Sequence, residues 1–197
     1  NPPYVMSPPT VSPLTYREAG LAGDDLVHHL VTHCVEHLKA NGTCQLLANW
    51  AITDQPWQDR LASWAPTGAD LWVIERERLD PFTYIELWLT DAGLAGDPSW
   101  SQRYREWLDY FSALGITGGG MGWITVVNSG RDQPDVTIQS WPHEVHQPVG
   151  PAISAHRRAL DWAQQPTPAV LATAWWLRPD IVQETFGRPG EEDAQHI

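Results

Sequence analysis

Asn1-Pro2-Pro3-Tyr4 opens the chain and decides how the rest of it is interpreted. A residue before proline is kept out of the helical region, and proline fixes its own φ, so Asn1 and Pro2 are expected to form a stiff, extended turn. The turn presents two hydrogen-bond acceptors, the Asn1 side-chain oxygen and the Pro2 carbonyl, beside the ring of Tyr4. This set suits a planar group with an NH2, whose two N–H bonds point at the acceptors while its plane stacks on Tyr4.

A planar NH2 nitrogen must be activated before it can attack an electrophile. An amide or ring-amine nitrogen is a poor nucleophile because its lone pair is delocalised. Preorganised acceptors on its hydrogens stabilise the positive charge that develops during attack, so the turn is predicted to orient and activate such a nitrogen. The alternative interpretation is a proline-rich leader, because Pro8, Pro9 and Pro13 follow closely.

The motif in residues 1–4 resembles the catalytic Asn-Pro-Pro-Tyr of class I S-adenosylmethionine-dependent N-methyltransferases, which include the HemK-type protein-glutamine enzymes and the adenine-N6 DNA enzymes. The resemblance implies that Asn1 and Pro2 bind the target NH2 and that Tyr4 stacks on the target. It implies that Pro3 belongs to the same catalytic motif, and that the cofactor is S-adenosyl-L-methionine.

The resemblance extends along much of the chain. Residues 16–24, Tyr-Arg-Glu-Ala-Gly-Leu-Ala-Gly-Asp, are similar to the link that follows this motif in HemK-like enzymes. Residues 45–50 and 72–77 resemble an actinobacterial branch of HemK-like methyltransferases that carries an extra C-terminal domain. We therefore expect an α/β fold, namely the C-terminal half of a Rossmann-like methyltransferase sheet with a small, mainly helical appendage. Residues 1–130 are the expected catalytic domain, and residues 131–197 are the expected small, incomplete C-terminal domain.

One departure from the family concerns the cofactor. The family binds S-adenosylmethionine with a glycine-rich loop and an acidic residue that precede the motif, whereas this chain begins at the motif. We interpret the chain as an internal piece of a longer protein that lacks the cofactor-binding residues, and we expect it to be inactive alone. The glycine run 118–122 does not replace the loop, because it follows a predicted helix and opens a strand, which is the reverse of a cofactor loop.

Hydrophobic periodicity and capping residues predict the elements that follow the motif. Asp24 and Asp80 are the expected N-caps of two helices. The expected helices span residues 24–39, 56–64, 80–92 and 97–114, and the expected strands span residues 43–50, 70–75, 123–128 and 136–138. The resemblance implies that the strand at 123–128 is antiparallel to its neighbours. Three further helices are expected to begin at residues 151, 168 and 179.

Two places in these strands are of functional interest. Asn49 and Trp50 would lie at the carboxyl end of their strand, the edge where ligands bind in open α/β sheets, so they are candidate substrate-binding residues. The charged run 75–78 is predicted to be a solvated strand end, although Glu75 or Arg76 could face the site.

Composition limits the partners and the compartment. The net charge of −12 argues against a general phosphate-binding surface, so a nucleic-acid partner is disfavoured. No apolar run is long enough to cross a membrane, and no signal peptide is visible in these residues. Cys34 and Cys44 have no metal-binding spacing and indicate reduced thiols in a cytoplasmic protein. The series His29, His33 and His37 is interpreted as a solvated helix face, so no metal site is predicted.

Three functions from different classes remain open. The first is an S-adenosylmethionine-dependent N-methyltransferase that acts on a planar amide or amine nitrogen, glutamine-like or nucleobase-like. The second is a non-catalytic scaffold or interaction module that retains the methyltransferase fold. The third is an rRNA or DNA base N-methyltransferase, which the acidic charge disfavours.

Overall fold

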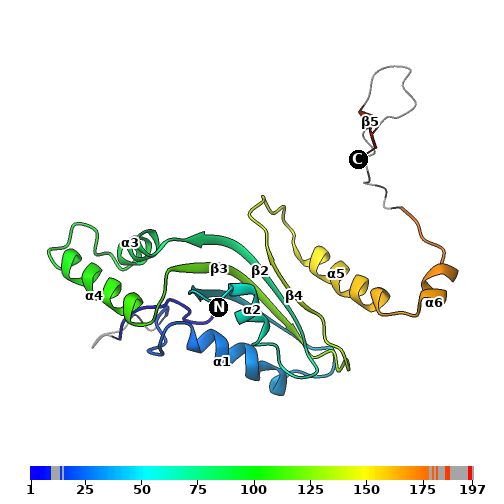
Figure 1. Ribbon diagram of the computed structural model, residues 1–197, viewed down its shortest axis with the longest axis horizontal. Helices are drawn as coiled ribbons and strands as arrows, with labels where there is room; N and C mark the ends of the chain where they lie inside the picture. Colours follow the sequence, from blue (N-terminus) through cyan, green and yellow to red (C-terminus); the bar gives the residue numbers. More distant parts are fainter. Residues whose placement is uncertain are drawn as a thin grey trace. The chain divides into compact units, whose positions relative to one another are not determined.

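The computed structural model describes residues 1–9, 14, 16–177, 179, 181, 185–186 and 195–196. The chain divides into two units, Asn1–Val145 and His146–Ile197. The first unit contains a four-stranded sheet with helices, which makes it an α/β fold (Figure 1). No helix in this described part of the chain combines the length and the apolar character needed to cross a membrane.

The sheet of the first unit is mixed. Its strands are β1 (Thr43–Ile52), β2 (Asp70–Leu79), β3 (Gly118–Val127) and β4 (Val136–Ser140), in the spatial order β1-β3-β2-β4. β3 is antiparallel to both β1 and β2, as predicted, and β2 is parallel to β4. Because β1, β2 and β4 therefore run in the same direction, their carboxyl ends lie at one edge of the sheet.

β4 belongs to the first unit. The boundary between the two units in the sequence therefore lies after Val145 and not at residue 130, where it was expected. Leu71 of β2 pairs with Val136, and the ladder continues to Glu75 and Ser140. The backbone N–H of Trp141 extends it by donating to the Glu75 carbonyl at 2.8 Å. These hydrogen bonds hold β4 on the sheet, and the second unit begins only at His146.

The helices expected in the first unit are present with shifted ends. They are α1 (Asp25–His33), α2 (Trp57–Ala62), α3 (Pro81–Asp91) and α4 (Trp100–Ala113), with a 3₁₀ turn, η1 (Cys34–His37), after α1. Asp80 caps α3 as predicted, because its side chain accepts hydrogen bonds from the N–H groups of Phe82 and Thr83. Asp24 precedes α1 but forms no capping bond; its carboxylate accepts the N–H of Ala51 and pairs with Arg60.

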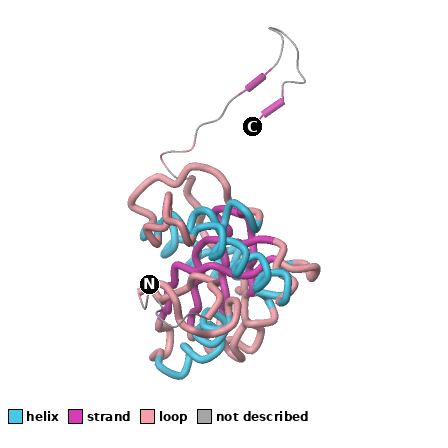
Figure 2. The backbone as a smooth tube through the Cα atoms, turned by 90° about the vertical axis from the view of Figure 1, so that its left-hand side faces the viewer, coloured by secondary structure: helices cyan, strands magenta, loops and turns pink. Residues whose placement is uncertain are grey.

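The helices pack on the sheet through two hydrophobic clusters. Val27 of α1 and Leu61 of α2 share one cluster with Trp50, whereas Tyr84 of α3 and Phe111 of α4 belong to the other cluster. Successive strand residues point to opposite faces, so β1 contributes to both clusters. Figure 2 shows helices on both sides of the strands.

The glycine run 118–122 lies inside β3 and not before it, which corrects the predicted start of that strand. A Cβ at Gly120 would lie 2.6 Å from Cε2 of Trp50, and a Cβ at Gly119 would lie 2.5 Å from the ring of Tyr84. The two glycines therefore leave space for large aromatic side chains on opposite faces of β3. The run was expected to precede the strand because glycine inside a strand is uncommon.

The second unit is mainly helical in its described residues. It contains α5 (Gly150–Ala163), α6 (Thr167–Ala172) and a pair of short antiparallel strands, β5 (Thr185–Phe186) and β6 (Gln195–His196). The helix expected from residue 179 falls mostly outside the described residues, and where it was to end the chain forms β5 instead.

Candidate functional site

The motif in residues 1–4 lies at the surface of the first unit. Asn1 is exposed, whereas Pro2, Pro3 and Tyr4 are half-buried. The ring of Tyr4 packs edge-on against Trp88 of α3, with 6.4 Å between the ring centres. The motif thus has a fixed aromatic end and an open end at Asn1.

Residues 16–24, which follow the motif, connect it to α3 through hydrogen bonds. The Arg17 carbonyl accepts the N–H of Val5 at 2.9 Å, and Tyr4 forms a β-bridge with Glu18. The buried guanidinium of Arg17 donates to the Trp88 carbonyl at 2.7 Å and lies over the Trp88 ring, 5.6 Å from its centre. Residues 16–18 therefore hold the motif against α3.

The hydroxyl of Tyr84 connects the motif to the sheet. It is fully buried and accepts the backbone N–H of Met6 at 3.1 Å and the side-chain amide of Asn49 at 2.9 Å. Burial raises the pKa of Tyr84, so the hydroxyl remains neutral. Because Met6 lies two residues after Tyr4, the exit from the motif is fixed beside the carboxyl-terminal half of β1. Nothing in the sequence alone connected Tyr84 with the motif.

Asn49 and Trp50 lie near the carboxyl end of β1, as predicted, but beneath the surface. Asn49 is 1% exposed and bonded to Tyr84, and Trp50 is completely buried. The Trp50 ring stacks on Trp57, with 5.8 Å between ring centres. The structure therefore makes them supports of the site and does not place them in an accessible lining, because their neighbours cover both side chains.

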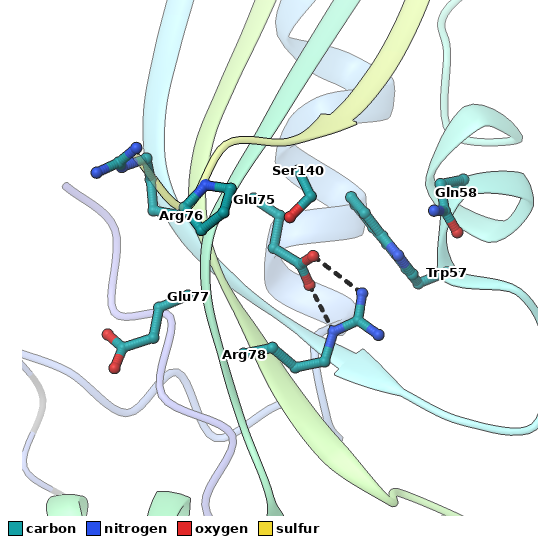
Figure 3. A pocket seen from close by; sticks show the side chains of 8 residues that line it. Trp57, Gln58, Glu75, Arg76, Glu77, Arg78 and Ser140 are labelled. Carbon is teal, nitrogen blue, oxygen red and sulfur yellow. Dashed lines mark hydrogen bonds and ion pairs between the residues drawn. The ribbon is translucent and has the colours of Figure 1, made fainter. Parts of the chain in front are cut away.

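The charged run 75–78 also differs from its expected role. It lies inside β2, not after it, and Glu75 is only 3% exposed. Glu75 forms an ion pair with Arg78, and both line a cavity of about 500 Å³ (Figure 3). This cavity was missed because a run of alternating charges is typical of a solvated segment.

Neither a cofactor loop nor a metal centre is formed by the described residues. S-adenosylmethionine, which the resemblance implies, requires a glycine-rich turn from a strand into a helix, but the run 118–122 lies within β3, under Trp50 and Tyr84. The run 118–122 therefore cannot serve as the loop that holds this cofactor. The described residues also contain no group of three or more His, Cys, Asp or Glu side chains that could hold a metal ion.

The motif in residues 1–4 is held at one end and open at the other. Its first residue is exposed, its aromatic end is packed, and its exit is hydrogen-bonded to a buried hydroxyl. Comparison with known proteins adds no family: no family model matches the chain, and no curated protein matches it.

Proposed function

We propose that this chain forms the acceptor-binding part of an S-adenosylmethionine-dependent N-methyltransferase that acts on a planar amide or amine nitrogen. The observation that carries the proposal is the anchored motif in residues 1–4. Its exposed Asn1 leads into a proline pair, and both the ring of Tyr4 and the N–H of Met6 are held by α3. A turn this constrained loses little freedom when a substrate binds.

The arrangement of the sheet also supports this proposal. An antiparallel β3 lies between β1 and β2, the orientation that the resemblance to HemK-like enzymes implied. The motif lies beside the carboxyl half of β1, and ligands of open α/β sheets bind at that edge. We therefore propose that the first unit is the C-terminal part of a Rossmann-like methyltransferase sheet.

In the proposed mechanism, the residues of the motif position the acceptor. The Asn1 side-chain oxygen and the Pro2 carbonyl accept the two N–H bonds of the acceptor, and Tyr4 contacts its plane. The nitrogen lone pair is left facing outward, and positive charge on the nitrogen is stabilised as the N–C bond forms. In the full-length protein S-adenosylmethionine would supply the methyl group, its S–CH3 bond breaking as the N–C bond forms and S-adenosylhomocysteine leaving. The acceptor proton leaves to water after transfer, so no general base is required.

The net charge and the free thiols bear on the class of acceptor and on the compartment in which the protein acts. The net charge of −12 favours a protein or small-molecule acceptor over nucleic acid. Cys34 and Cys44 are free thiols, which agrees with a reducing, cytoplasmic compartment.

Methyl transfer is the direct test. The protein in its natural full length is incubated with S-adenosylmethionine labelled in its methyl group, and with either a glutamine-containing peptide or an adenine-containing oligonucleotide. We expect label on the peptide NH2. Transfer to the oligonucleotide alone would favour the nucleobase enzyme, and binding of cofactor with no transfer to any NH2 acceptor would favour a non-catalytic module.

A further inference from the structure

The cavity beside β2 contains a second candidate site. Its lining comes from the carboxyl-terminal residues of β2, from Ser140 at the end of β4, and from Trp57 and Gln58 of α2 (Figure 3). Its volume of about 500 Å³ is within the range of small-molecule sites. It lies at the sheet edge where the carboxyl ends of β1, β2 and β4 meet.

A β-bulge determines which charged side chains face this cavity. Glu75 pairs with Gly122 and Glu77 pairs with Met121, so Arg76 is an extra residue in β2. In a regular strand, residues 75 and 78 would point to opposite faces, but the extra residue brings Glu75 and Arg78 onto the same face. Figure 3 shows these two side chains facing one another, with Arg76 and Glu77 directed away from them.

The guanidinium of Arg78 is held on one edge and one face. Its Nε and Nη2 donate to the two carboxylate oxygens of Glu75 at 2.8 and 2.9 Å. The Glu75 side chain is 4% exposed, so this carboxylate is shielded from water. The guanidinium also lies over the ring of Trp57, 5.4 Å from its centre. Its Nη1 forms no hydrogen bond with any residue in the described part of the chain, and the Arg78 side chain is 44% exposed.

The ion pair between Arg103 and Glu106 provides a comparison for the ion pair between Arg78 and Glu75. Arg103 and Arg78 are both 44% exposed, and each pairs with a glutamate three residues away. Glu106, the partner of Arg103, is 39% exposed, whereas Glu75 is buried. A surface pair such as Arg103–Glu106 fluctuates in solvent, but the Arg78 guanidinium is preorganised.

We propose that this cavity binds a ligand carboxylate, which accepts hydrogen bonds from the free edge of Arg78. Ser140 and Gln58, which line the same cavity, provide further hydrogen-bonding groups. A guanidinium in this geometry binds a carboxylate bidentately. Glu75 already offsets the charge of Arg78, so a singly charged carboxylate fits better than a doubly charged phosphate. The site is independent of the proposed methyl transfer.

The test is a titration of the full chain with benzoate, followed by NMR of the Arg78 Nε–H and the Trp57 indole N–H. We expect both resonances to shift and to saturate with a dissociation constant of about a millimolar, the scale for a ligand of this size. Benzamide, the neutral isostere, and inorganic phosphate are expected to bind at least about tenfold more weakly. Equal binding of benzamide, or tighter binding of phosphate, would overturn the assignment of a carboxylate site.

Single substitutions test whether benzoate binds at Arg78. Arg78→Met is expected to weaken benzoate binding at least about tenfold, while Arg103→Met, which removes an equally exposed arginine, is expected to leave it unchanged. Arg78→Lys keeps the charge without the planar fork and is expected to lose most of the affinity, which separates geometry from charge and covers the case in which Arg78→Met does not fold. Unchanged binding in Arg78→Lys would show that Arg78 does not recognise the carboxylate.

Discussion

The side-chain amide of Asn49 donates a hydrogen bond of 2.9 Å to the hydroxyl of Tyr84, the same oxygen that accepts the N–H of Met6. One buried oxygen therefore joins a strand, a helix and the segment that leaves the motif in residues 1–4. Together with the packing of Tyr4 on Trp88, this oxygen fixes the position of the motif.

Tyr84→Phe is expected to destabilise the first unit by about 1–3 kcal/mol, because it leaves the buried N–H groups of Met6 and Asn49 without an acceptor. Denaturant unfolding measures the loss, and hydrogen exchange at the Met6 amide should become faster. Tyr104→Phe is the control, because the Tyr104 hydroxyl forms no hydrogen bond with the described residues. Equal stability of the two variants would refute the anchoring role of Tyr84.

The hydrogen bonds that Tyr84 accepts from Asn49 and Met6 could not be predicted from the sequence. Asn49 and Tyr84 are 35 residues apart, and Met6 and Tyr84 are 78 apart. Their meeting depends on how α3 packs against β1, which no local pattern encodes. The carboxyl-end position of Asn49 was predictable from the strand pattern, but its burial was not, because the covering residues come from distant segments.

Gly120→Ala is expected to cost about 1–3 kcal/mol of stability, because the new methyl group would meet the indole of Trp50, which is buried and stacked on Trp57. Thermal or urea unfolding measures this cost. In a Trp50→Phe background the smaller ring makes room, so the added cost of the alanine should shrink. Strictly additive costs in the double variant would contradict the proposed close approach of Gly120 and Trp50.

Local signals accounted for much of the secondary structure of the first unit but not for the details of its strands. The Asp80-Pro81 cap and the apolar run of β1 were sufficient for those two elements. The continuation of β2 through residue 79 was not predictable, because charges usually mark a strand end. It is paired with β3 and bent by a bulge, which are non-local features. The cavity around Arg78 was not predicted either, because it depends on this bulge and on residues of α2 and β4.

The thiol of Cys34 is expected to react slowly with alkylating reagents. Burial, with a further contribution from Cys44, raises the pKa of Cys34 from 9.0 to about 12. A raised folded-state pKa favours the folded protein below pH 9 and loses this effect as the pH rises toward 12. Alkylation of Cys34, followed by peptide mass spectrometry, should accelerate about tenfold per pH unit between pH 7 and 10. A plateau near pH 9, like that of a free thiol, would show that the pKa is not raised.

Asn1→Ala in the full-length protein is expected to lower methyl transfer by roughly a hundredfold or more, the scale for losing one preorganised polar contact in a transition state. Asn1 is exposed and packs little, so stability should stay within about 0.5 kcal/mol of the wild type. Calorimetry should find cofactor affinity nearly unchanged. Asn1→Asp retains a side-chain oxygen at the same position and should recover most of the lost rate. If the alanine variant turned over like the wild type, residues 1–4 would be a rigid turn without a catalytic role.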